Sequence, residues 1–193
     1  MAKVSSARDD LIKTAAELFR ARGYEGVGVA ELLEASGAPR GSLYFHFPGG
    51  KEQIGVEVVE RVGAAVTAQF SGLAERDITL DQFVDHVFRH TAKMVKERDF
   101  DASCPIAAIA AELGAQSPDL RASVTTQFEA WEREVARAAR TRGLTERNAA
   151  DFASALITSM EGAFLVSKAQ RSVAAHQNAA KAMKALAAML GAH

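Results

Sequence analysis

Apolar residues recur every three or four positions along most of the chain, which is the spacing of an amphipathic helix. The clearest case runs from Leu80 to Glu97, where Phe83, Val87 and Thr91 fall on one face. No long segment alternates polar and apolar residues at period two, as a half-buried strand would. Ala, Leu, Glu, Arg and Lys, which favour helices, dominate the composition. The pattern therefore predicts an all-α fold with about nine helices.

Glycines, prolines and capping residues set the expected ends of these helices. Gly23 ends the first, a Ser-Gly-Ala break at 36–38 separates the second and third, and a Pro-Gly-Gly break at 48–50 precedes the fourth. A Cys104-Pro105 step opens a short segment that ends near Gly114. The expected ranges are 6–22, 29–35, 39–47, 51–70, 80–97, 105–114, 117–143, 145–170 and 173–190.

Composition and charge narrow the class of protein. The 193 residues are 48% hydrophobic and 24% charged, which is enough apolar material for a core without staples. A single cysteine, Cys104, excludes an internal disulfide and suits a reducing cytoplasm. We find no apolar leader after Met1 and no run of about 18 apolar residues, so neither a signal peptide nor a membrane span is expected.

Net charge alone does not indicate a nucleic-acid partner. Residues 1–51 hold seven basic and six acidic side chains, a net of +1, and the remainder holds sixteen and eighteen, a net of −2. Neither part is a basic module. Any DNA binding must therefore depend on a few placed cations instead of a broad positive field.

The two short helices around the 36–38 break have the layout of a helix-turn-helix. Side chains that suit DNA are concentrated at its second helix and just beyond, at Pro39, Arg40, Gly41, Ser42, Tyr44, Phe45, His46 and Lys51. An arginine such as Arg40 can fork onto a guanine edge, and hydroxyl and imidazole groups can reach phosphates. Lys51 stands at a helix start, where backbone N–H groups already favour an anion.

From about Leu11 to Lys51 the sequence closely resembles the TetR family of repressors. The matching segments are Ala16–Phe19, Gly23–Tyr24, Gly37, Gly41–Phe47 and Lys51. The resemblance implies a recognition helix at about 39–47. It further implies base contacts by Arg40, Gly41, Ser42 and Phe45, and phosphate contacts by Tyr44, His46 and Lys51.

Two departures from the family pattern point to a subgroup. Val27 and Gly28 stand where the family usually has a Thr or Ser that caps the second helix and contacts phosphate. The Phe-Pro-Gly-Gly-Lys form at 47–51 places the lysine one residue later than usual and resembles the LmrA/YxaF-type subgroup. Segments 104–107 (Cys-Pro-Ile-Ala) and 161–163 (Glu-Gly-Ala) also resemble that subgroup, so the resemblance extends weakly over the whole chain.

The resemblance implies a three-helix DNA-binding domain at residues 1–51 and a larger effector-binding and dimerisation domain at 52–193. The expected pocket residues are Phe88, Cys104, Phe128, Trp131, Glu161 and Phe164. The last two long helices are expected to form the dimer seam, through Ala153, Leu156, Ile157, Ala163 and Phe164 in one and Ala182, Ala185, Leu186 and Met189 in the other. A small hydrophobic or aromatic ligand would release this homodimeric repressor from a palindromic operator.

Other classes of function remain open at this point. A helical dimer could bind a hydrophobic ligand without DNA, and Cys104 at a helix start could make the regulator a redox sensor. His86 and His90 have the i, i+4 spacing of a metal pair, but no third ligand is evident. With no phosphate loop or catalytic triad pattern visible, we expect no enzyme activity, no metal and no cofactor.

Overall fold

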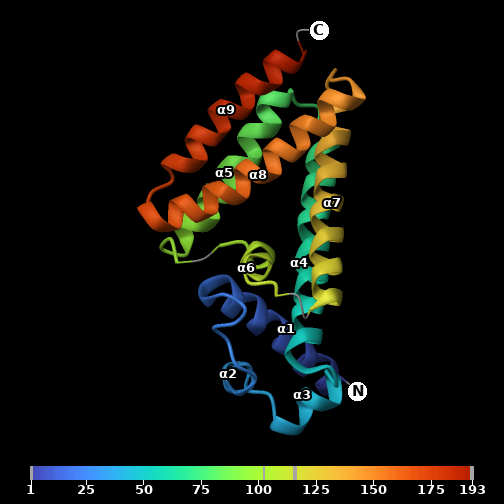
Figure 1. Cartoon of the computed structure of the whole chain (residues 1–193), viewed down its shortest axis with the longest axis vertical. Coiled ribbons are helices and arrows are strands. Elements are labelled where there is room, and N and C mark those ends of the chain that lie inside the picture. The colour runs from blue at the N-terminus through green and yellow to red at the C-terminus, as the bar shows by residue number, and fades with distance from the viewer. Residues whose placement is uncertain (1, 102, 115–116, 192–193) are drawn as a thin grey trace. The chain divides into compact units, whose positions relative to one another are not determined.

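The computed structural model describes residues 2–101, 103–114 and 117–191, with side chains from residue 7 onward except those of Arg40 and Ser42. Every regular element within these ranges is an α-helix, which confirms the predicted all-α fold of about nine helices (Figure 1). The nine are α1 (Ala2–Arg22), α2 (Val29–Ser36), α3 (Arg40–His46), α4 (Gly50–Ala74), α5 (Leu80–Glu97), α6 (Pro105–Ala111), α7 (Pro118–Arg140), α8 (Glu146–Gln170) and α9 (Ala174–Gly191).

The expected helix ends were wrong by several residues in four places. α1 begins at Ala2 instead of Ser6, because no glycine or proline interrupts the first residues. α4 continues past residue 70 to Ala74, which is 8% exposed, so packing holds its last turn. α6 ends at Ala111, before Gly114, and α7 ends at Arg140, ahead of a turn in which Gly143 takes φ +99°.

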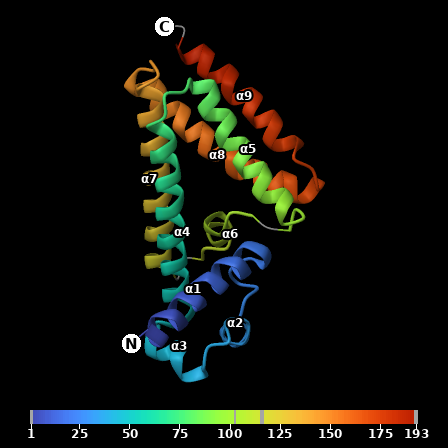
Figure 2. The same ribbon diagram turned by 180° about the vertical axis from the view of Figure 1, so that it is seen from behind.

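The first of two compact units holds α1, α2, α3 and α6, together with α4 as far as residue 64 and α7 as far as residue 127. Its core is built from helix faces that the apolar spacing predicted. Leu11, Phe19, Leu32, Leu43 and Phe47 are each fully buried or nearly so. α1 packs against α2, α3 and α6, so the short helices α2 and α3 are held on a longer one (Figure 2).

The second unit holds residues 65–103 and 128–193, in which α5, α8 and α9 pack against one another. α5 begins with a capping box: the Thr79 hydroxyl accepts the Gln82 N–H (3.2 Å), and the Gln82 side chain accepts the Thr79 N–H (2.9 Å). Thr145 caps α8 by accepting the Asn148 N–H at 3.2 Å. These caps satisfy backbone donors that a helix start otherwise leaves open.

No membrane span was expected from the sequence, and within the described residues one helix, α8, is long and apolar enough to cross a membrane by length and composition alone. Core helices of water-soluble proteins pass the same test. α8 packs against α5 and α9, and 44% of its most apolar window is buried inside the chain. Packing in the core of the second unit therefore accounts for part of its apolar composition.

Candidate functional site

α2 and α3 are joined by a tight turn that fixes the start of α3. Gly37 takes the left-handed conformation (φ 66°) that glycine tolerates best, and its N–H bonds to the Glu34 carbonyl. Neither helix has a side-chain cap at its start, since Gly28 and Pro39 occupy the capping positions. α2 therefore lacks the side-chain cap that the family usually has before this helix. Val27, which stands there, is a fully buried core residue.

α3 presents two different faces. Leu43 and Phe47 are fully buried and anchor the helix in the core of its unit. Tyr44 and Phe45, in contrast, are 65% and 77% exposed, which is unusual for large rings on a helix of seven residues. His46 is half-buried and lies edge-on to Phe45, with ring centroids 5.0 Å apart. The exposed rings and the imidazole thus form one presented edge of α3.

The other residues predicted for DNA contact fall on the same short helix. Pro39 is exposed at its start, and a Cβ added at Gly41 would meet no described atom within 4 Å. Packing of the chain therefore does not require a glycine at position 41, and the space leaves room for a partner. The side chains of Arg40 and Ser42 lie outside the described residues, although their backbone belongs to α3.

Lys51 lies in the first turn of α4 and is held by two neighbours that sequence reasoning did not assign a role. Its ammonium is 3.5 Å from a Glu25 carboxylate oxygen and 4.2 Å from the centre of the Tyr24 ring. Burial raises the pKa of Tyr24 to about 12, with contributions from Glu25 and Glu52. The Gly23-Tyr24 pair was visible in the sequence, but its contact with Lys51 was not.

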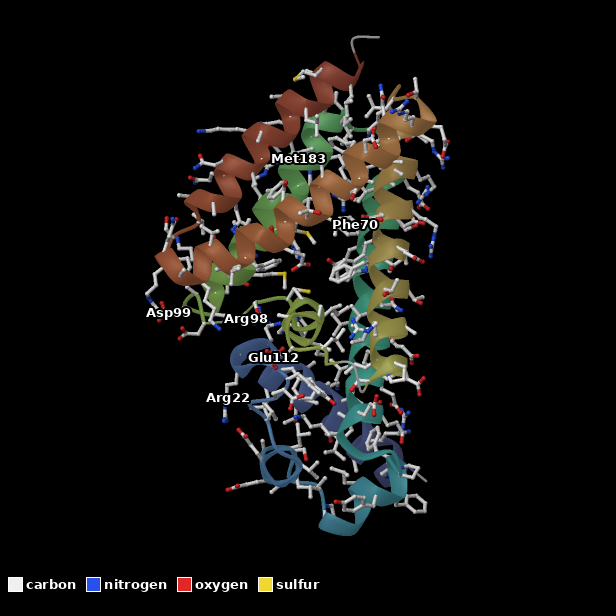
Figure 3. All side chains as sticks on the ribbon, viewed as in Figure 1. Arg22, Phe70, Arg98, Asp99, Glu112 and Met183 are labelled. Carbon is white, nitrogen blue, oxygen red and sulfur yellow. The ribbon has the colours of Figure 1, made fainter. Side chains whose placement is uncertain are left out.

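Glu112, just after α6, fixes the same turn from another part of the chain (Figure 3). Its carboxylate accepts the backbone N–H of Glu25 at 2.6 Å. Gly23 takes φ +80°, a conformation that favours glycine, and a Cβ there would also displace the Glu112 carboxylate. The turn that carries Tyr24 and Glu25 toward Lys51 is thus held by a residue 87 positions away.

The expected pocket residues are divided between the two units. Cys104, which precedes α6 and is buried, belongs to the first unit, whereas the other five belong to the second. Phe128 and Trp131 meet edge to face at 5.2 Å, but Phe164 packs its ring against His176 at 5.3 Å. Phe88 is 2% exposed and Glu161 is half-buried in the middle of α8.

The residues expected at the dimer seam differ in burial between α8 and α9. Those nominated on α8, namely Ala153, Leu156, Ile157, Ala163 and Phe164, are all at least 94% buried within a single chain. On α9, Met189 is 68% exposed, and Ala182 and Ala185 are also exposed. The large apolar side chains that α8 does expose are Leu165 (70%) and Val166 (40%), which the sequence pattern did not single out.

Comparison with known proteins agrees with this architecture. Residues 11–65 match the model for bacterial regulatory proteins of the tetR family, and residues 82–182 match that for the C-terminal domain of LmrA/YxaF-like transcriptional regulators. An uncharacterised HTH-type transcriptional regulator of Mycobacterium tuberculosis is 31% identical over 173 residues, which is 85% of each chain. The HTH-type transcriptional regulator LmrA of Bacillus subtilis is 27% identical over 83% of this chain and 86% of its own.

Solved structures give the same answer for the fold. The reduced form of Escherichia coli NemR aligns with a TM-score of 0.78 at 25% identity, covering 93% of this chain and 97% of that one. A regulatory protein TetR from Rhodobacter sphaeroides aligns with a TM-score of 0.81 at 25% identity, covering 92% and 96%. The helix-turn-helix and the helical domain that follows it thus define a DNA-binding transcriptional regulator.

The chain belongs to the TetR family of transcriptional regulators and carries an LmrA/YxaF-like C-terminal domain. The resemblance inferred from the sequence is therefore confirmed at the level of both family and subgroup.

Proposed function

We propose that the chain is a cytoplasmic repressor that binds a palindromic operator as a homodimer and is released by a small apolar, aromatic ligand. The observation that carries this proposal is the exposed edge of α3, where Tyr44 and Phe45 stand out beside buried Leu43 and Phe47. Exposing large rings costs a protein apolar burial, which contact with a partner would recover. The functional division proposed is DNA binding by residues 1–51 and effector binding with dimerisation by 52–193.

The proposed roles within the interface differ by position. Arg40 recognises bases, and Lys51 supplies affinity by contacting a phosphate. The other base contacts come from Pro39, Gly41, Ser42 and Phe45. The other phosphate contacts of the DNA backbone come from Tyr44 and His46. Lys51 suits its role because it lies in the first turn of α4, where the helix dipole also favours an anion.

Dimerisation is proposed through α8 and α9. Leu165 and Val166 on α8 and Met189 on α9 are exposed in the single chain, and a second copy would cover them. Two copies would then present two α3 helices to successive major grooves, about one helical turn apart.

Fluorescence anisotropy with a labelled duplex from the region upstream of the reading frame tests the proposal. We expect binding at least about 1,000-fold tighter than to a scrambled duplex, and a steep loss of affinity as salt rises. Arg40→Ala should cost about 1–3 kcal/mol and relax sequence preference, whereas Lys51→Ala should weaken all duplexes alike. If the protein binds neither duplex in a salt-sensitive way, it is a ligand-binding helical dimer instead.

The effector proposal rests on the aromatic contact of Phe128 with Trp131 and on the half-buried acidic residue Glu161 on α8 of the same unit. Trp131 is the only tryptophan, so its emission reports on ligand binding directly. A panel of hydrophobic aromatic compounds should include one that shifts emission and lowers operator affinity, with a coupling of about 1–3 kcal/mol. If none does either, and oxidation of Cys104 alone releases the DNA, a redox-sensing regulator replaces this proposal.

A further inference from the structure

α4 and α7 run side by side in the first unit (Figures 1 and 2). A groove with both polar and apolar lining lies along the two helices. Its volume is about 610 Å³. The residues that matter for its chemistry are Glu52, Val56 and Glu60 on α4 and Asp119, Ala122 and Ser123 on α7. One turn further along, a Cβ on Gly63 would overlap the Gln127 side chain, so the helices are in contact just beyond the groove.

The groove is acidic without a compensating cation. Glu52, Glu60 and Asp119 line it, and no Lys or Arg is present among its described lining residues. Glu52 and Asp119 each lie in the first turn of a helix, where the helix dipole stabilises a carboxylate. Glu60 lies nearly three turns into α4, where the helix dipole gives its carboxylate no such advantage. The helix dipole therefore accounts for two of the three acids and leaves the third unexplained.

A second observation points to a ligand. Ser123 lines the groove and is 8% exposed, and its buried hydroxyl oxygen has no hydrogen-bond partner among the described residues. A hydroxyl buried in this way loses its bonds to water without replacement, which costs about 1–3 kcal/mol. Once the Ser123 side chain rotates toward the groove, a donor bound there would restore that bond.

The arrangement of charge selects the kind of donor. Glu52, Val56 and Glu60 follow one another at four-residue steps on one face of α4, so the two carboxylates are about 12 Å apart along the helix with an apolar side chain between them. Ala122 adds apolar surface from α7. Within the described residues, no three acidic, histidine or cysteine side chains are grouped to hold a metal ion. A ligand with separated positive charges and a hydrocarbon middle fits this order better than an inorganic cation does.

We propose that the groove binds a linear aliphatic polyamine. One terminal ammonium contacts Glu52 and Asp119, the other contacts Glu60, and the methylenes lie on Val56 and Ala122. The Ser123 hydroxyl accepts a hydrogen bond from an amine N–H. This site is separate from the aromatic cluster of the second unit, and it does not depend on the protein binding DNA.

Isothermal titration calorimetry of spermidine into the full-length protein, without DNA and at about 0.15 M salt, tests the proposal. We expect one saturable site per chain, and weaker binding of putrescine, which is too short to reach both ends of the groove. Glu60→Gln should weaken spermidine about fivefold, because one screened ion pair is lost. Ser123→Ala should weaken it by a similar factor through the lost hydrogen bond.

The matched control is Asp151→Asn, which removes one exposed negative charge on α8 in the other unit and should leave binding unchanged. Magnesium chloride at equal ionic strength should compete poorly if shape matters as well as charge. The absence of a saturable site in the wild type, an equal loss in Asp151→Asn and Glu60→Gln, or displacement by magnesium as effective as by spermidine would overturn the proposal.

Discussion

If Lys51 binds DNA as proposed, we expect the Glu25 carboxylate to compete with DNA for it, so that removing the carboxylate strengthens operator binding. The carboxylate lies 3.5 Å from the Lys51 ammonium. In a complex where Lys51 contacts a phosphate, Glu25 must either give up its partner or remain beside a second negative charge. Glu25→Gln removes that charge and keeps the side-chain size. The Glu112 contact also survives, because it involves the backbone N–H of Glu25.

The size of the expected gain in operator affinity follows from how exposed the Glu25 and Lys51 side chains are. The Glu25 side chain is 68% exposed and that of Lys51 21%, so solvent screens most of the Coulomb energy and the pair is worth about 0.5–1 kcal/mol. Two half-sites in a dimer double this, which corresponds to roughly a 5- to 30-fold lower Kd. The slope of log K against log salt should become steeper by up to about one per half-site, because Glu25 no longer neutralises the charge with which Lys51 contacts the phosphate.

Fluorescence anisotropy over a salt series, with single and double variants, provides the measurement. In a Lys51→Gln background, Glu25→Gln should have almost no effect, since the group for which it competes is gone. Glu34→Gln, an exposed acid on α2, controls for the loss of one negative charge from the same unit. The reasoning fails if Glu25→Gln strengthens binding equally with and without Lys51, or if Glu34→Gln gives the same gain.

Three further predictions concern the second unit. Burial lowers the pKa of His176 to about 4 from an ordinary 6.5, so below pH 6.5 the unfolded chain binds more protons than the folded one. The free energy of unfolding should therefore fall by up to roughly 3 kcal/mol between pH 6.5 and 4. Urea unfolding of His176→Asn should show a weaker pH dependence. Arg142 donates to three backbone carbonyls at and just after the end of α4 and to the Ala138 carbonyl on α7. Arg142→Lys should lower the free energy of unfolding by about 1–3 kcal/mol, whereas Arg140→Lys, at an exposed position, should change it little. Leu165→Asp should give a folded protein by circular dichroism and a monomer by light scattering. Ile157→Asp buries a charge inside the chain and should reduce folding itself. A dimeric Leu165→Asp would place the dimer interface elsewhere.

The apolar spacing alone determined the helices and their order. Leu11, Phe19, Leu43 and Phe47 could be assigned to a core because a surface helix buries one face every three to four residues, and the structure buries all four. Gly37 could be read as a turn because left-handed backbone favours glycine. The helix-turn-helix and its family were therefore available from the sequence.

Tertiary structure alone decided which residues surround Lys51 and which side of α8 is exposed. The contact of Glu112 with the Glu25 backbone joins positions 87 residues apart, and no local pattern signals such a pairing. On α8, apolar side chains occur on several faces, so periodicity could not separate the side packed within the chain from the side left open. The structure buries Ile157 and exposes Leu165, because α5 and α9 already cover one face of α8. Local spacing fixes which side chains share a helix face, but only the packing of distant helices decides which face remains free.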